Sequence, residues 1–173
     1  REQRTLIEQF SKNSDFANMR LDLSDKTLDE MTTVLTRMTE LTATAGNGVY
    51  DGFGHQAILN ELKQLSEVAL GLANTTDSMG RPLFAGRSSV DVPFTRNVDG
   101  TVAYNGDRGQ HSVQVSESLT TLTGIDGGSA FMRVETPNGR RSVFEVIQSA
   151  MNSIETGAQI KGQATGGNKT RLD

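Results

Sequence analysis

Hydrophobic residues recur every three or four positions in the first part of the chain, which is the spacing of one face of an α-helix. The residues that carry this spacing are Leu28, Met31, Leu35 and Met38. They predict an amphipathic helix over residues 23–45. The spacing continues more loosely upstream, where the polar residues 13–15 could break it. An unbroken helix of about 40 residues would be near 60 Å long.

A second row of hydrophobic residues follows a glycine-rich loop at residues 46–54 and steps by four and three. Its members are Ile58, Leu62, Leu65, Ala69 and Leu72. Such a narrow seam is typical of a helix that packs on another helix. We therefore expect the two segments to form an antiparallel helical hairpin, with this seam against the first one.

The pattern then changes to short alternating segments separated by turns rich in Gly, Asn and Asp. It predicts antiparallel strands at residues 90–92, 101–104, 112–115 and 132–135. A third helix is predicted over residues 142–156, closing at Gly157 and followed by a flexible tail. The hydrophobic residues that indicate it include Phe144, Ile147 and Met151.

These elements predict an α+β fold, in which an elongated antiparallel helical rod carries a small inserted antiparallel β domain. We expect residues 1–84 to form the helical hairpin of the rod and residues 85–141 to form the inserted β domain. Residues 142–173 would supply the returning helix of the rod and the C-terminal tail. A long rod without an obvious catalytic constellation favours a structural or assembly role.

Composition and charge narrow the classes of function. The chain has 173 residues, of which 35% are hydrophobic and 5% aromatic, and it has no cysteine. The absence of cysteine excludes thiolate metal sites, thiol nucleophiles and disulfides. A formal net charge of −4 argues against electrostatic binding to nucleic acid or to an anionic membrane. Because the chain begins at Arg1, we expect it to be a piece of a longer protein.

No catalytic, cofactor-binding or metal-binding residue is predicted. His55 and His111 lack neighbours at metal-ligand spacing, so we expect both on the surface. The segment 162–170 is similar to a phosphate-binding loop, but Asn168 separates its last glycine from Lys169, and no buried strand precedes it. We therefore expect a protein that is not an enzyme and has no cofactor.

Short motifs occur in a specific order around the end of the second helix. Leu72-Ala73-Asn74 leads into the segment Gly80-Arg81-Pro82-Leu83-Phe84-Ala85-Gly86, and Tyr104-Asn105-Gly106-Asp107 follows. This order resembles the hook-associated protein 3 family, the hook–filament junction branch of the flagellin superfamily, except that Pro82 replaces an aromatic residue. The residues matched to the motifs are Asn74, Gly80, Arg81, Leu83, Phe84, Gly86, Tyr104, Gly106 and Asp107.

The resemblance implies an extracellular part of the bacterial flagellum, exported by the flagellar type III apparatus. It further implies that copies form a ring that contacts hook-associated protein 1 on the hook side and flagellin on the filament side. An export chaperone would bind the C-terminal region that the chain lacks. Two alternatives stay open: a flagellin filament subunit, and a non-flagellar fibre protein of the phage-tail or adhesin type.

Overall fold

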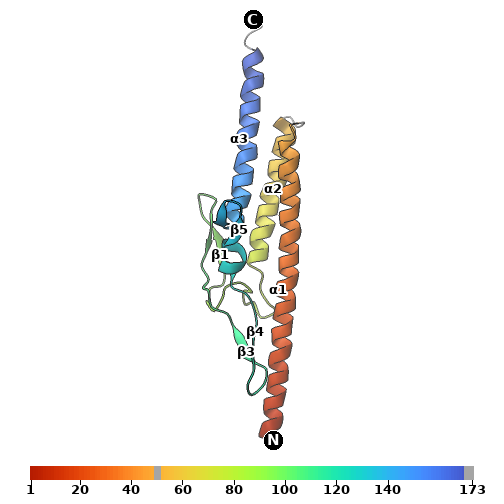
Figure 1. Ribbon diagram of the computed structural model, residues 1–173, viewed down its shortest axis with the longest axis vertical. Helices are drawn as coiled ribbons and strands as arrows, with labels where there is room; N and C mark the ends of the chain where they lie inside the picture. The colour runs from red at the N-terminus through yellow and green to blue at the C-terminus, as the bar shows by residue number, and fades with distance from the viewer. Residues whose placement is uncertain (49–51, 170–173) are drawn as a thin grey trace.

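Three helices form an elongated rod, and short strands lie along one side of it (Figure 1). The computed structural model describes residues 1–48 and 52–169. Helix α1 spans Glu2–Gly46, α2 spans Gly52–Ala73 and α3 spans Val143–Lys169. Helix α2 runs antiparallel to α1, and α3 packs mainly on α2 and runs antiparallel to it. The predicted rod with a small β region is confirmed.

Helix α1 is a single rod of 45 residues, about 67 Å long at 1.5 Å per residue. The break considered at residues 13–15 does not occur, because the polar groups of Asn13 are satisfied within the helical conformation. Its Oδ1 atom accepts a hydrogen bond from Gln9 at 3.0 Å, and its Nδ2 atom donates to the carbonyl oxygen of Gln114 at 2.7 Å.

The buried face of α1 follows a heptad spacing over most of the helix. Its fully buried members are Ala17, Arg20, Ser24, Thr27, Met31, Val34, Met38, Leu41 and Ala45. Leu28 and Leu35 are half-buried at the edge of this face rather than at its centre. Leu35 instead lines an apolar groove of about 550 Å³ with Val146 and Ile147 of α3.

The seam of α2 is displaced in the same way from its predicted position. Ile58, Leu62 and Ala69 are buried as expected, whereas Leu65 and Leu72 are half-buried. The buried row also contains His55, Leu59, Ser66 and Ala73. The two rod seams are therefore shifted relative to the predicted ones because α2 packs against α3 as well as against α1.

Helix α3 continues beyond the predicted stop at Gly157 as far as Lys169. A glycine inside an exposed helix costs only about 1 kcal/mol relative to alanine, and no heavy atom lies within 4 Å of the Cβ position at Gly157. The expectation that the helix ends there is wrong. The last four residues of the predicted tail lie outside the described residues.

The β region consists of three separate two-stranded antiparallel hairpins. They pair β1 (Phe94–Arg96) with β2 (Val102–Tyr104), β3 (Ser112–Gln114) with β4 (Thr120–Leu122), and β5 (Val134–Thr136) with β6 (Gly139–Arg141).

One predicted strand is absent, and the strand predicted at 132–135 is present with shifted bounds as β5. Residues 90–92 do not form a strand; Pro93 follows them, and it has no N–H to donate to a strand ladder. In the segment predicted as a strand at 132–135, a π-helical turn (η1, Gly128–Met132) precedes β5.

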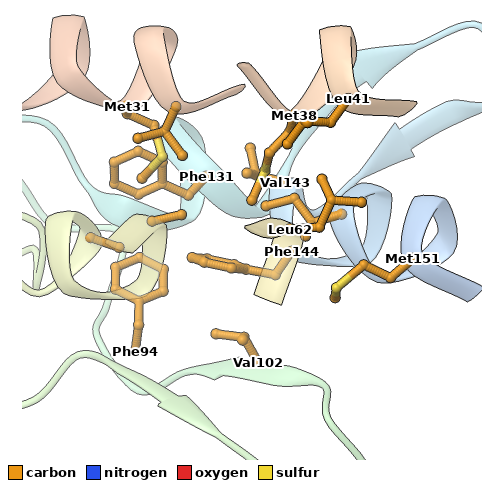
Figure 2. Packing of buried hydrophobic residues seen from close by; sticks show 14 of the residues in the cluster. Met31, Met38, Leu41, Leu62, Phe94, Val102, Phe131, Val143, Phe144 and Met151 are labelled. Carbon is orange, nitrogen blue, oxygen red and sulfur yellow. The ribbon is translucent and has the colours of Figure 1, made fainter. Parts of the chain in front are cut away.

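An aromatic cluster joins the strands to the rod (Figure 2). The ring of Phe94 on β1 packs against Tyr104, Phe131 and Phe144 at centroid distances of 4.9, 5.6 and 6.0 Å. Met31, Met38 and Leu62 extend the same core along the rod, as do Ile147 and Met151 of α3. The first and third hairpins thus share one hydrophobic core with the helices.

Candidate functional site in the connecting loop

The first part of the loop between α2 and β1, residues 74–87 (the connecting loop), contains most of the motif residues. At its start the side-chain amide of Asn74 makes two hydrogen bonds with the backbone of Phe94. Asn74 Nδ2 donates to the Phe94 carbonyl oxygen at 2.8 Å, and the Phe94 N–H donates to Asn74 Oδ1 at 2.9 Å. Asn74 therefore fixes the end of α2 to the first strand, 20 residues further along the chain.

Asp77 organises the tight turn that follows. Its Oδ1 atom accepts hydrogen bonds from the N–H groups of Met79 and Arg81, both at 2.9 Å. Gly80 lies inside this turn with φ of +76°, a conformation that glycine adopts without steric cost. The turn thereby directs one Asp77 oxygen toward its own backbone and leaves Oδ2 for a distant partner.

That partner is Arg20, in the middle of α1. The Arg20 guanidinium forms a buried ion pair with Asp77 Oδ2, and the two side chains are 7% and 1% exposed. The same guanidinium donates to the Pro82 carbonyl oxygen at 3.2 Å and to the Thr123 carbonyl oxygen at 3.4 Å. A single arginine thus connects the long helix, the connecting loop and the end of the second hairpin.

The electrostatics of Asp77 favour its charged form. Burial by itself would raise the pKa of this carboxyl group. The backbone amides of Arg81 and Met79 and the guanidinium of Arg20 outweigh the burial, so the pKa lies below the usual value. Asp77 is therefore a carboxylate held in a structural network.

Arg81 covers the outer side of the same network. Its guanidinium lies 3.6 Å from Asp77 Oδ2, and its centre is 5.1 Å from the centroid of the Phe16 ring. Arg20 approaches the same ring at 5.9 Å. Phe16 therefore contacts both cations that surround Asp77, an arrangement in which the ring face attracts positive charge.

The second half of the connecting loop binds the β region through its backbone. The Phe84 carbonyl oxygen accepts a hydrogen bond from the Gly127 N–H at 3.0 Å. The Tyr104 hydroxyl lies 2.9 Å from the same oxygen and 2.8 Å from the Asp107 carbonyl oxygen. The Ala85 carbonyl oxygen accepts from the Asp107 N–H at 3.1 Å. The Phe84 side chain is fully buried against Phe131, with ring centroids 5.0 Å apart.

Asp107 closes the loop from the other side. Its Oδ1 atom accepts hydrogen bonds from the N–H groups of Arg87 and Gly109 at 2.7 and 2.8 Å, which lower the pKa of this exposed carboxyl group. Gly86 has φ of +68°, and a Cβ atom there would overlap Asp107. Gly106 is close-packed against the Tyr104 hydroxyl in the same turn.

The structure brings eight of the nine motif residues into two adjoining clusters, and Asn74 makes a separate contact. Gly80 and Arg81 belong to the Asp77 turn, and Asn74 fixes Phe94. Leu83, Phe84, Gly86, Tyr104, Gly106 and Asp107 surround the backbone hub at Phe84. Sequence reasoning missed Arg20 and Asp77. The signal for Arg20 was present, because the spacing of Met31, Thr27, Ser24 and Arg20 continues the buried heptad with polar residues.

The chemistry of the site is that of a structural network. Among residues 1–48 and 52–169, no group of three or more His, Asp or Glu side chains could hold a metal ion. His111 is exposed as predicted, but His55 is 4% exposed in the first turn of α2, so its surface assignment is wrong. Within the described part of the chain, no helix is long and apolar enough to span a bilayer.

The first half of the chain matches the model of a protein family. The model of the bacterial flagellin N-terminal helical region matches residues 1–89, which include α1, α2 and the connecting loop. The chain belongs to this flagellin family. The matched region ends just beyond Gly86, so it includes the Arg20–Asp77 pair and Phe84, but not the hub partners Tyr104 and Asp107.

Individual flagellin-family proteins are similar over most of the chain. Flagellar hook-associated protein 3 of Salmonella typhimurium is 25% identical over 156 residues, which cover 86% of this chain and 48% of the relative. The crystal structure of Xanthomonas campestris FlgL superposes with a TM-score of 0.71 at 33% identity and covers 78% of this chain and 43% of that one.

The flagellar junction protein FlgL of Legionella pneumophila superposes with a TM-score of 0.70 at 29% identity, covering 80% and 41% of the two chains. The chain therefore spans about half the length of the curated relatives that it matches. It corresponds to a part of such a protein that contains the rod and the β region.

Proposed function

We propose that the chain is the rod and outer β region of a hook–filament junction protein of the bacterial flagellum. The observation that supports this most strongly is the similarity to hook-associated protein 3 over 86% of the chain. The motif residues that first pointed to this family lie in the Asp77 turn, around the backbone hub at Phe84, and at the contact between Asn74 and Phe94. We infer a mechanical role without catalysis.

In this role, copies of the full-length protein would assemble head to tail into a ring at the end of the hook. Contacts of this kind continue along an assembly instead of closing on a pair. The ring would contact hook-associated protein 1 on one side and flagellin on the other. An export chaperone would bind the part of the full-length protein that lies beyond this chain.

The proposed location is extracellular, after export in an unfolded state through the flagellar type III apparatus. One property of the chain suits this route. It has no cysteine, so no disulfide would have to be reduced before export.

The location can be tested with antibodies raised against residues 85–141 and gold labelling of intact flagella from the bacterium that makes the protein. A single band of gold between hook and filament is expected. Label along the whole filament would instead indicate a flagellin subunit. Flagella without label, in cells that produce the protein, would contradict a flagellar role and favour the fibre alternative.

A further inference from the structure

The hairpin β3–β4 contributes no residue to the hydrophobic core that the rod shares with the other two hairpins. Neither of its strands has a fully buried residue. Phe94 on β1 lies in the aromatic cluster, and Val134 on β5 is half-buried against the same core. Leu119 and Leu122 at its outer strand are 58% and 49% exposed. An isolated two-stranded hairpin is at best marginally stable in water, so its order depends on what it lies against.

It lies against the N-terminal part of α1 (Figure 1). At one end, the Gln114 carbonyl oxygen accepts a hydrogen bond of 2.7 Å from Asn13 Nδ2. At the other end, the Thr123 carbonyl oxygen accepts from Arg20 Nε at 3.4 Å. Arg20 lies seven positions after Asn13 in α1, which corresponds to a rise of about 10 Å along the helix axis. Three residues of a β-strand have about the same length.

The middle of the hairpin therefore lies over the middle of this helical segment. Val113 and Thr121 are paired across the two strands and are the residues whose side chains are partly buried. Ala17 lies on the α1 seam between Asn13 and Arg20 and is 1% exposed.

A cavity of about 390 Å³ borders the hairpin on the side of residues 80–91. Most of its lining comes from that segment, and the rest includes Phe16 and Arg20 of α1 and Ser112 and Val113 of β3. Few buried apolar contacts and a neighbouring cavity are the features of a segment that opens locally, at a free energy well below that of global unfolding.

From these observations we infer that the hairpin β3–β4 is a strap that opens from α1 independently of the aromatic core, with the Asn13–Gln114 hydrogen bond as its outer latch. Opening exposes Ala17 and extends the accessible seam of α1, which already includes Leu6 at 47% exposure. The inference that the hairpin opens is independent of the proposed function. Only the role of this opening, which would be to free a helical surface during assembly, rests on the proposed function.

Because the chain has no cysteine, single cysteines report the opening directly. Ala17→Cys is compared with Ala69→Cys, which replaces a residue buried at 0% exposure in α2. We expect a maleimide to label position 17 at least about tenfold faster than position 69, because only global or large-scale opening exposes the latter. Equal labelling rates at the two positions would overturn the inference.

The latch is tested in the Ala17→Cys background. Asn13→Ala should accelerate labelling about two- to tenfold, the factor that corresponds to loss of one neutral hydrogen bond. Asn18→Ala, an exposed asparagine on the same helix, is the matched control and should leave the rate unchanged. An unchanged rate in Asn13→Ala would overturn the assignment of the latch.

Amide hydrogen exchange shows whether the opening is confined to the strap. In Asn13→Ala, faster exchange is expected at residues 112–122 while residues 94–104 and 134–141 keep their wild-type rates. Faster exchange in all three hairpins alike would contradict the inference and indicate one cooperative β domain. These measurements use the isolated chain, so their failure leaves the gold-labelling result on the flagellar role unaffected.

Discussion

At the scale of the residue, substitution of Arg20, the buried arginine of α1, has the largest predicted effect on the free energy of unfolding. Arg20→Met removes the buried cation from Asp77, which is 1% exposed, and leaves the half-exposed Arg81 at 3.6 Å. Removal of one partner of a buried ion pair costs about 3–5 kcal/mol. Because Arg81 and two backbone amides still contact Asp77, we expect a loss near the lower end of this range in the free energy of unfolding, measured by urea denaturation followed by circular dichroism.

The control for this substitution is Arg4→Met. Arg4 is 88% exposed and its ion pair with Glu8 spans 3.7 Å on the surface of α1, so its removal should leave stability unchanged within error. Equal effects of the two substitutions would show that the Arg20–Asp77 pair does not hold the helix to the connecting loop.

The lowered pKa of Asp77 predicts a pH dependence. The charged carboxylate contributes stability that is complete above the ordinary aspartate pKa of about 3.9. This contribution is lost as the pH falls through the lower folded-state pKa. The difference in unfolding free energy between wild type and Asp77→Asn should therefore be constant between about pH 5 and about pH 8. The difference should shrink in more acidic solution.

Denaturant titrations over that series of pH values provide the measurement, with the exposed residue Asp29 as the site of the control variant Asp29→Asn. A difference between wild type and Asp77→Asn that persists unchanged in strong acid would mean that the carboxylate charge contributes nothing.

Substitution of two glycines of the connecting loop distinguishes the cost of a left-handed backbone conformation from the cost of a steric overlap. Gly80 and Gly86 both have positive φ, at +76° and +68°. A Cβ atom at Gly80 meets nothing within 4 Å, whereas one at Gly86 overlaps Asp107. Gly80→Ala should cost about 1–2 kcal/mol from the left-handed conformation alone. Gly86→Ala should cost at least about 1 kcal/mol more, and thermal unfolding curves that rank them in the opposite order would contradict the packing at Asp107.

At the scale of the element, the seams of the rod determine which leucines matter most. Leu62 is 1% exposed at the centre of the core, so Leu62→Ala should cost about 2–5 kcal/mol. Leu35 and Leu65 are half-buried, and their replacement by alanine should cost clearly less. Chemical denaturation of the three variants checks the order. A larger loss at Leu35 than at Leu62 would favour the seam read from the sequence over the observed one.

The helices could be predicted because their hydrophobic spacing repeats over many consecutive residues. The strands could be predicted only in part, because the alternating pattern of each strand covers few residues. The position of each seam could not be predicted, because α2 contacts two helices and Leu28 and Leu35 have the same spacing as the buried residues beside them. The end of α3 was missed for a related reason: glycine lowers helix stability without forbidding a helix.

The connecting loop illustrates the same limit at the site. Motif letters in this loop and in the turn after β2 identified Asn74, Phe84 and Asp107. Asn74 and Asp107 have partners 20 residues away in Phe94 and Arg87, whereas Phe84 binds Gly127 beyond the second hairpin. Arg20 and Asp77 are 57 residues apart in the sequence, and their pairing depends on how the loop folds back on α1. A long-range ion pair of this kind leaves only an indirect trace, here a polar residue at a buried heptad position.

At the scale of the whole molecule, the rod and the β region are joined at a few well-defined places. The aromatic cluster connects the first hairpin and η1 to α3, and Val134 of the third hairpin packs on the same core. The connecting loop is fixed through Asn74, Arg20 and the Phe84 carbonyl oxygen. The second hairpin lies on α1 by itself. This division gives a stiff body with one separately held strap, which suits a part that joins two larger assemblies.

The most direct test of the junction role is filament retention in cells. A strain that lacks the gene receives the full-length gene as wild type, Arg20→Met or Arg4→Met, and electron microscopy gives the fraction of hooks that carry a filament. Wild type and Arg4→Met should restore filaments, whereas Arg20→Met should leave hooks bare and flagellin in the medium. Normal filaments on hooks in the strain without the gene would contradict the account.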